Sequence, residues 1–231
     1  VLVNADEYAE AHALDPVALE ALLEAGLTQL YIARQKRKRP GLDDKIILGW
    51  NALMITALAR AGGCLGEDTY IRAAEKCFDF LISKFKSDEP GTGFYHTCKA
   101  DVAKYPAFLD DYAFLIQASV HLQEVSSDTR YLTWANKLTA HVVEHFADRN
   151  TGYFFFTSND QEDVILRKKE VYDGATPSAN STMAENLQYL SLLFDRPEWA
   201  ELAIKARDGL LKAIINYPTS FSTWCMLIMN E

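Results

Sequence analysis

Two pairs of adjacent aspartates are the residues in this sequence best suited to chemistry. Asp43 and Asp44 form the first pair, and Asp110 and Asp111 form the second pair 67 residues later. A third polar segment follows at the same spacing, because Ser178 lies 67 residues after Asp111. When carboxyl groups from different segments share a cavity, one can act as an acid and another as a base or nucleophile. Cleavage of a glycosidic bond requires this arrangement.

The predicted site combines catalytic carboxylates with side chains that bind a substrate. Asp44 and Asp111 are the predicted catalytic pair. Trp50 and Tyr112 follow the two aspartate pairs, where their rings could stack on a sugar or belong to the core. The predicted substrate-binding residues are Asp43, Trp50, Asn51, Asp110, Tyr112, Asp173, Ser178 and Asn180.

Structural roles compete with these functional ones. An aspartate before a helix often accepts hydrogen bonds from the first free N–H groups, so one member of each aspartate pair could be an N-cap. The small polar segment from Asp173 to Ser181 could bind a ligand or cap the helix that follows. The charged run 167–170 could bring charge to the same place or lie on a solvated edge.

An internal repeat of helical hairpins positions these segments. After each polar segment we expect a helix that is apolar almost all round, as buried helices are. Each is followed by an amphipathic helix that opens on an aromatic residue, at Tyr70, Tyr131 and Trp199. One further helix is expected from Pro16 to about Arg37, and another begins near Phe221.

The predicted fold is all-α: inner apolar helices covered by outer amphipathic ones in a curved (α/α) toroid. Long loops with short β-hairpins, at Gly91–Tyr95 and Asn150–Phe156, lead into the starts of the inner helices at one rim. An open helical solenoid is the alternative. We expect residues 1–231 to form a single domain that is part of a longer chain.

Composition excludes several classes of function. The net charge of −9 at pH 7 argues against binding to nucleic acid. No apolar run is long enough to cross a membrane. The four cysteines contain no C-x-x-C pair, so reduced thiols and a cytoplasmic location are expected. No metal or cofactor is expected, because His141, Glu144 and His145 match a zinc motif but fall on the outward face of their helix.

Three motifs, in order, are similar to those of one protein family. They are Arg37–Ile46 with Gly49–Ile55, Phe108–Ile116, and Tyr172–Ser181. They resemble the thioredoxin-domain-containing family related to spermatogenesis-associated protein 20. The resemblance implies the C-terminal part of a six-hairpin (α/α)6 toroid of the glycosidase and N-acylglucosamine 2-epimerase type, without the thioredoxin-like domain.

Two functions stay open at this point. The first is a carbohydrate-processing enzyme, either a hydrolase or an epimerase. The epimerase version is weaker, because the resemblance implies cavity-facing histidines whereas His121 lies late on its helix and His96 lies in a hairpin. The second is a non-catalytic module that binds carbohydrate or protein, or serves as a scaffold, beside a thioredoxin-like domain. Exposed apolar edges of an incomplete ring predict self-association.

Overall fold

The computed structural model describes residues 4–87, 93–161 and 164–229. The chain divides into two compact units, Val1–Asp44 and Lys45–Glu231. The single domain expected over residues 1–231 stays a prediction.

The first unit contains two helices, α1 (Ala5–Ala11) and α2 (Pro16–Gln35). Asp15 caps α2, accepting a hydrogen bond from the Ala18 N–H at 3.2 Å, and Pro16 occupies the first helical position. The predicted helix at Pro16 is confirmed and ends two residues before the expected boundary. The short helix α1 was not predicted.

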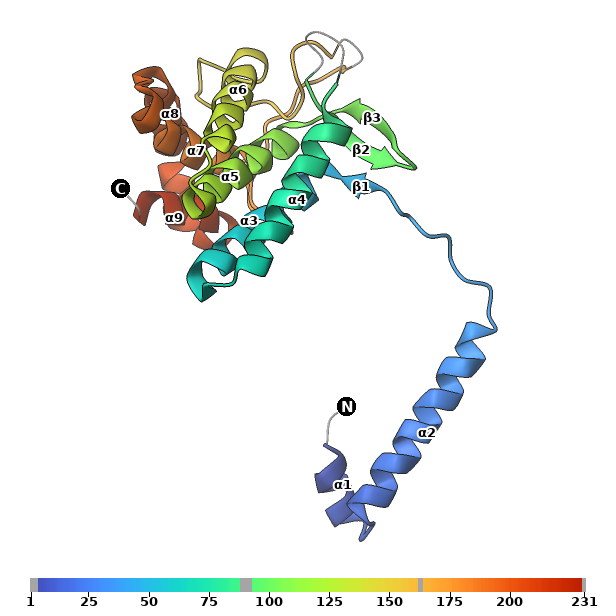
Figure 1. Cartoon of the computed structure of the whole chain (residues 1–231). Coiled ribbons are helices and arrows are strands. Elements are labelled where there is room, and N and C mark those ends of the chain that lie inside the picture. The colour runs from blue at the N-terminus through green and yellow to red at the C-terminus, as the bar shows by residue number, and fades with distance from the viewer. Residues whose placement is uncertain (1–3, 88–92, 162–163, 230–231) are drawn as a thin grey trace. The chain divides into compact units, whose positions relative to one another are not determined.

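The second unit consists of helical hairpins, each with an inner helix followed by an outer one (Figure 1). The inner helices are α3 (Leu48–Leu65), α5 (Leu109–Ser126) and α7 (Ala179–Phe194), and the outer helices are α4 (Asp68–Phe85), α6 (Arg130–His145) and α8 (Pro197–Asn216). A 3-10 turn at Pro218–Ser220 leads into α9 (Ser222–Met229), which packs on α7 and α8.

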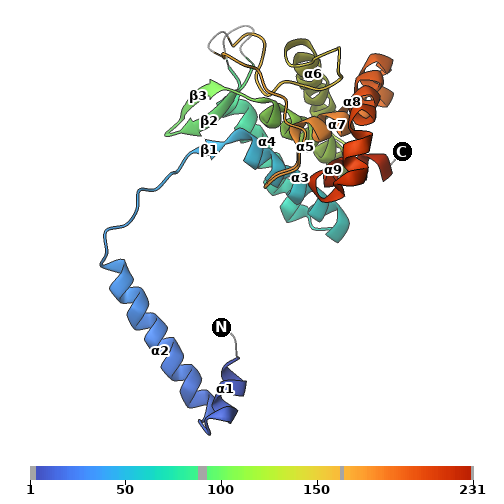
Figure 2. The ribbon, with the colours of Figure 1, turned by 180° about the vertical axis from the view of Figure 1, so that it is seen from behind.

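The inner helices contact one another in series, α3 on α5, α5 on α7 and α7 on α9, as Figures 1 and 2 show from opposite sides. Each outer helix packs on its own inner helix. Helix α5 is buried around most of its circumference, whereas α6 buries one face through Tyr131, Ala135, Leu138 and Val142. The predicted all-α arrangement of inner and outer helices is therefore confirmed.

A small antiparallel sheet lies where the outer helix α4 passes into α5. Its strands β1 (Ile46–Ile47), β2 (Tyr95–Lys99) and β3 (Val102–Pro106) pair in the order β1-β2-β3. A bridge between Ala147 and Phe154 marks the second expected hairpin. Gly91 and Thr92 of the first predicted hairpin lie outside the described residues.

The spacing of 67 residues does not fix where the inner helices begin. They start at residues 48, 109 and 179, so the intervals are 61 and 70. The difference arises because the connections vary in length. Ile47 is the N-cap residue of α3, so the expectation that Asp43 or Asp44 caps this helix is wrong.

Two further features concern membrane-spanning segments and cysteines. Within the described residues, no helix combines the length and apolar character that crossing a bilayer requires. All four cysteines are free thiols.

Candidate functional site

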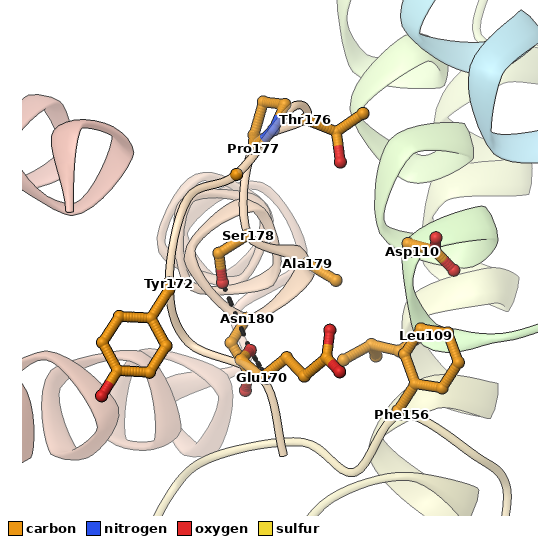
Figure 3. Close-up of a pocket in the computed structure, with 11 residues that line it drawn as sticks. Leu109, Asp110, Phe156, Glu170, Tyr172, Thr176, Pro177, Ser178, Ala179 and Asn180 are labelled. Carbon is orange, nitrogen blue, oxygen red and sulfur yellow. Dashed lines mark hydrogen bonds between the residues drawn. The ribbon is translucent and has the colours of Figure 1, made fainter. Parts of the chain in front are cut away.

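A cavity of about 140 Å³ opens between the starts of α5 and α7 (Figure 3). The first turn of α5 forms one wall, and the loop that leads into α7 forms the other. Its lining residues are Leu109, Asp110, Phe156, Glu170, Tyr172, Gly174, Thr176, Pro177, Ser178, Ala179 and Asn180. Two aspects suit a polyhydroxylated ligand: the aromatic ring of Phe156 and the two carboxyl groups, of Asp110 and Glu170.

Asp110 is the pocket carboxyl whose protonation is most perturbed. It lies in the first turn of α5, half-buried, and its Oδ1 accepts a hydrogen bond from the Asp111 N–H at 3.0 Å. Burial and the neighbouring charge of Asp111 raise its pKa to about 6, against the opposing effect of the backbone hydrogen bond. A carboxyl group with this pKa holds its proton over part of the neutral range, so it can donate one.

Asp111 is completely buried and serves two helix starts. Its Oδ2 accepts a hydrogen bond from the Phe108 N–H at 3.0 Å, which caps α5. Its Oδ1 accepts one from the Gly49 N–H at 2.8 Å, in the first turn of α3, whose own N-cap Ile47 offers no side-chain acceptor. Asp111 therefore holds the starts of α3 and α5 together, and it does not line the pocket.

His96, on β2, completes the bonding of this buried carboxylate. Its Nδ1 lies 2.7 Å from Asp111 Oδ2, and its ring packs against Phe108 with centroids 4.9 Å apart. The hydrogen bond to Asp111 is the largest effect on this histidine and raises its pKa, while burial lowers it. In the sequence alone, the only distinguishing feature of His96 is its position in an expected hairpin.

Tyr112 and Asn180 lie in the first turns of α5 and α7 and make similar contacts. The Tyr112 hydroxyl accepts a hydrogen bond from the Phe94 N–H at 3.0 Å, and Asn180 Oδ1 accepts one from the Phe154 N–H at 2.7 Å. Asn180 Nδ2 also donates to the Phe154 carbonyl at 3.1 Å. Both side chains are buried, so each fixes a hairpin that precedes its helix.

Asp173 fixes the loop that forms the second wall of the pocket. Its Oδ1 accepts from the Ser178 N–H at 2.8 Å, and its Oδ2 accepts from the Thr223 N–H at 2.7 Å and the Ser222 hydroxyl at 3.0 Å. The Ser178 side chain caps α7, accepting from the Ser181 N–H at 3.4 Å. These contacts tie the starts of α7 and α9 to one loop.

The other predicted residues lie apart from this pocket lining. Trp50, in the first turn of α3, is 65% exposed, and Asn51 Nδ2 donates to the Ile47 carbonyl at 2.8 Å. Asp43 and Asp44 belong to the first unit, so the pairing of Asp44 with Asp111 stays a prediction.

Glu170 belongs to the charged run 167–170, which the sequence left open between a place at the site and a solvated edge, and it lines the pocket. Figure 3 shows its side chain extending from the loop toward the α5 side of the pocket, where Leu109 and Asp110 lie. The Asn180 amide at 2.8 Å and the Ser178 hydroxyl at 3.4 Å bind its backbone carbonyl. Its carboxylate has no hydrogen bond or ion pair to the residues described. The charged run 167–170 contained no signal that separated Glu170 from its neighbours.

The residues of the zinc motif, His141, Glu144 and His145, lie on α6. Across the described residues, no group of three or more potential ligands could hold a metal ion. The expectation that its histidines point outward is wrong for His141. The ring of His141 is half-buried, 5.0 Å from the Tyr112 ring and 4.5 Å from that of His145.

Comparison with known sequences confirms the resemblance found in the motifs. Spermatogenesis-associated protein 20 of mouse is 33% identical over 205 residues, which cover 85% of this chain and 26% of that protein. An uncharacterized protein of Caenorhabditis elegans is 33% identical over 223 residues, or 94% of this chain and 30% of that protein. The chain thus spans about a quarter of the length of the curated relatives it matches. No protein-family model matches it.

Several solved structures with a similar fold are enzymes named for sugar substrates. An α-mannanase of Bacteroides thetaiotaomicron superposes with a TM-score of 0.59 at 15% identity, over 75% of this chain and 45% of that one. The cellobiose 2-epimerase of Spirochaeta thermophila superposes with a TM-score of 0.56 at 17% identity, over 72% of this chain and 43% of that one.

A third structure is an inactive variant of a Salegentibacter α-1,6-mannanase bound to α-1,6-mannotriose, in which two adjacent aspartates are replaced by asparagine. It gives a TM-score of 0.56 at 14% identity, over 83% of this chain and 52% of that one. These likenesses confirm the six-hairpin glycosidase-like fold.

Proposed function

We propose, from the premise that this chain is homologous to part of spermatogenesis-associated protein 20 and has the six-hairpin glycosidase-like fold, that it carries part of a carbohydrate-processing site. The reaction that the geometry supports best is hydrolysis of a glycosidic bond. One observation carries this proposal: Asp110, with its pKa raised to about 6, faces a pocket that also presents the carboxylate of Glu170.

The two carboxyl groups divide the work of hydrolysis. Asp110 donates its proton to the glycosidic oxygen as the bond to the anomeric carbon breaks. Glu170 either removes a proton from the attacking water or attacks the anomeric carbon itself. Asp44, the other catalytic carboxylate predicted from the sequence, belongs to the first unit and stays a prediction.

The proton donor in this proposal is Asp110 rather than Asp111. Asp111 is buried and engaged by two backbone N–H groups and by His96, so its oxygens have no path to a substrate. The inactivated mannanase supports a role for adjacent aspartates, since both members of its pair are replaced. In this chain Asp110 would act at the pocket, and Asp111 would support it from its buried position.

The test is a hydrolysis and epimerisation screen on the full-length protein, with mannose, cellobiose and α-1,6-linked manno-oligosaccharides in the panel. Asp110→Asn is expected to lower kcat at least about 100-fold. Because Asp110 must be protonated to donate, activity should fall as the pH rises above about 6. The control is Glu201→Gln, an exposed carboxylate on α8, which should leave turnover unchanged. Full activity in Asp110→Asn would remove this residue from the mechanism.

A binding module without catalysis is the second candidate, and a specific observation favours it. The side chains of Asp111, Tyr112, Asp173 and Asn180 are all used in hydrogen bonds that hold loops and helix starts together. Much of the predicted site is therefore structural. Glycan binding by the wild-type protein, with no product formed over the whole panel, would support this alternative over hydrolysis.

A further inference from the structure

His96 is placed to control the carboxyl group that faces the pocket. It contacts Asp111 at 2.7 Å, and the backbone N–H of Asp111 in turn donates to Asp110 Oδ1 at 3.0 Å. Histidine, buried aspartate and pocket aspartate thus form one connected chain from β2 to the cavity. The charged groups that act on His96 are Asp111 and Asp110 on α5 and Lys45 just before β1.

We propose that His96 is a positioning residue for the site: by binding Asp111 it fixes the first turn of α5, and its positive charge governs how tightly Asp110 holds its proton. The part of this inference that concerns catalysis rests on the proposed hydrolysis. The part that concerns protonation rests on the contacts and charges around Asp111 and involves no substrate.

The enclosed carboxylate of Asp111 couples His96 to Asp110. Asp111 is fully buried, so solvent screens its charge poorly and its effect on Asp110 is strong. A protonated His96 balances that charge and lowers the pKa of Asp110, whereas burial and Asp111 raise it. The pKa of His96 is raised from its ordinary value of 6.5, whereas that of Asp110 is about 6, so His96 still carries its charge over the range in which Asp110 loses its proton. The charge of His96 therefore lowers the upper end of the pH range in which Asp110 can act as an acid.

A purely structural role would make a different prediction. If His96 served only as a hydrogen-bond donor to Asp111, a neutral donor such as glutamine would replace it without any change at Asp110. The substitution His96→Gln separates these two roles, because it keeps a donor and removes the charge.

The test follows the Asp110 carboxyl by infrared spectroscopy of the full-length protein between pH 4 and pH 9, with the Asp110→Asn variant identifying its band. In His96→Gln the midpoint of Asp110 titration should rise by about 0.5 to 1 pH unit. The matched control is His121→Gln, since His121 Nδ1 makes the same kind of contact, 2.8 Å from Glu124 Oε2, late on α5. That control should leave the midpoint unchanged.

An unshifted Asp110 midpoint in a folded His96→Gln protein would overturn the inference. If that variant does not fold, the reciprocal measurement decides, because coupled groups affect each other equally. The midpoint of His96 titration, followed by nitrogen NMR of labelled histidine, should then fall in Asp110→Asn, and an unchanged value would overturn the inference. Neither measurement uses a substrate, so a failure of the proposed hydrolysis leaves both results interpretable.

Discussion

Asp110 and Asp111 show how two adjacent residues of one chemistry acquire different roles. Asp110 borders the pocket and accepts a hydrogen bond from one backbone N–H. Asp111 is enclosed, accepts hydrogen bonds from two backbone N–H groups and contacts the His96 ring. Active sites commonly hold two carboxyl groups in different environments, so that their pKa values differ and one acts as the acid and the other as the base. Here the enclosed charge of Asp111 helps to keep its neighbour protonated.

This division predicts different costs for removing each side chain. Asp111→Ala leaves the Gly49 and Phe108 N–H groups and the His96 ring without their acceptor inside the protein. We expect a loss of about 3 kcal/mol or more in the free energy of unfolding, because buried polar groups left unpaired are costly. Asp110→Ala removes one acceptor from a half-buried position and should cost about 1 kcal/mol or less.

Urea denaturation of the two variants checks this difference. The Asp110 variant is the matched control, since it changes the same side chain one position earlier on the same helix. Equal losses in the two proteins would contradict the structural role given to Asp111.

At the scale of elements, the sequence predicted which helices are inner and which are outer, because apolar residues all round differ plainly from a single apolar face. It did not predict how α3 begins. The acceptor for the Gly49 N–H comes from Asp111, 62 residues away on another helix, and local sequence carries no sign of it. Asp43 and Asp44 precede α3 in the sequence, as capping residues do, but the acceptor is the Asp111 side chain, which the fold brings to the start of this helix.

The hairpin after α6 gives a prediction of its own through Gly152. This glycine has φ of +80°, and a Cβ atom there would lie 2.8 Å from the Ala206 nitrogen and from the Leu202 carbonyl oxygen. Both neighbours are backbone atoms of α8, which cannot move aside without disturbing the helix. Gly152→Ala should therefore destabilise the protein by about 1–3 kcal/mol.

Thermal unfolding monitored by circular dichroism provides the measurement. Gly174→Ala is the control, because a Cβ atom at Gly174 has no neighbour within 4 Å and its φ is not positive. We expect this variant to keep the wild-type Tm within a few degrees. A Tm of the Gly152 variant equal to that of the control would show that the hairpin does not pack on α8 as described.

For the whole molecule, the sequence predicted which segments meet at the site but not what each side chain does there. The repeat correctly indicated that the starts of inner helices come together, since α3, α5 and α7 meet around Asp110 and Asp111. The roles of individual side chains depend on burial and on partners from other repeats. Tyr112 and Asn180 have the residue types of a sugar site, yet each is used to hold a hairpin backbone. Glu170 lines the pocket because of the path of the loop that leads into α7, and no local sequence pattern specifies that path.

The exposed apolar surface of the second unit supports the last prediction, that this chain associates with itself. Trp50 and Met54 lie one turn apart on α3 and are 65% and 56% exposed. Burying two large apolar side chains contributes about 1.5–3 kcal/mol each. The double variant Trp50→Ser, Met54→Ser should therefore weaken dimerisation of the isolated 231-residue chain at least about tenfold, measured by light scattering across a concentration series. Ile165→Ser is the control, because Ile165 is fully exposed in a loop rather than on a helix face. If the control weakens association as much as the double variant, general surface hydrophobicity rather than the α3 face drives it. If neither changes it, the contact lies elsewhere on the chain.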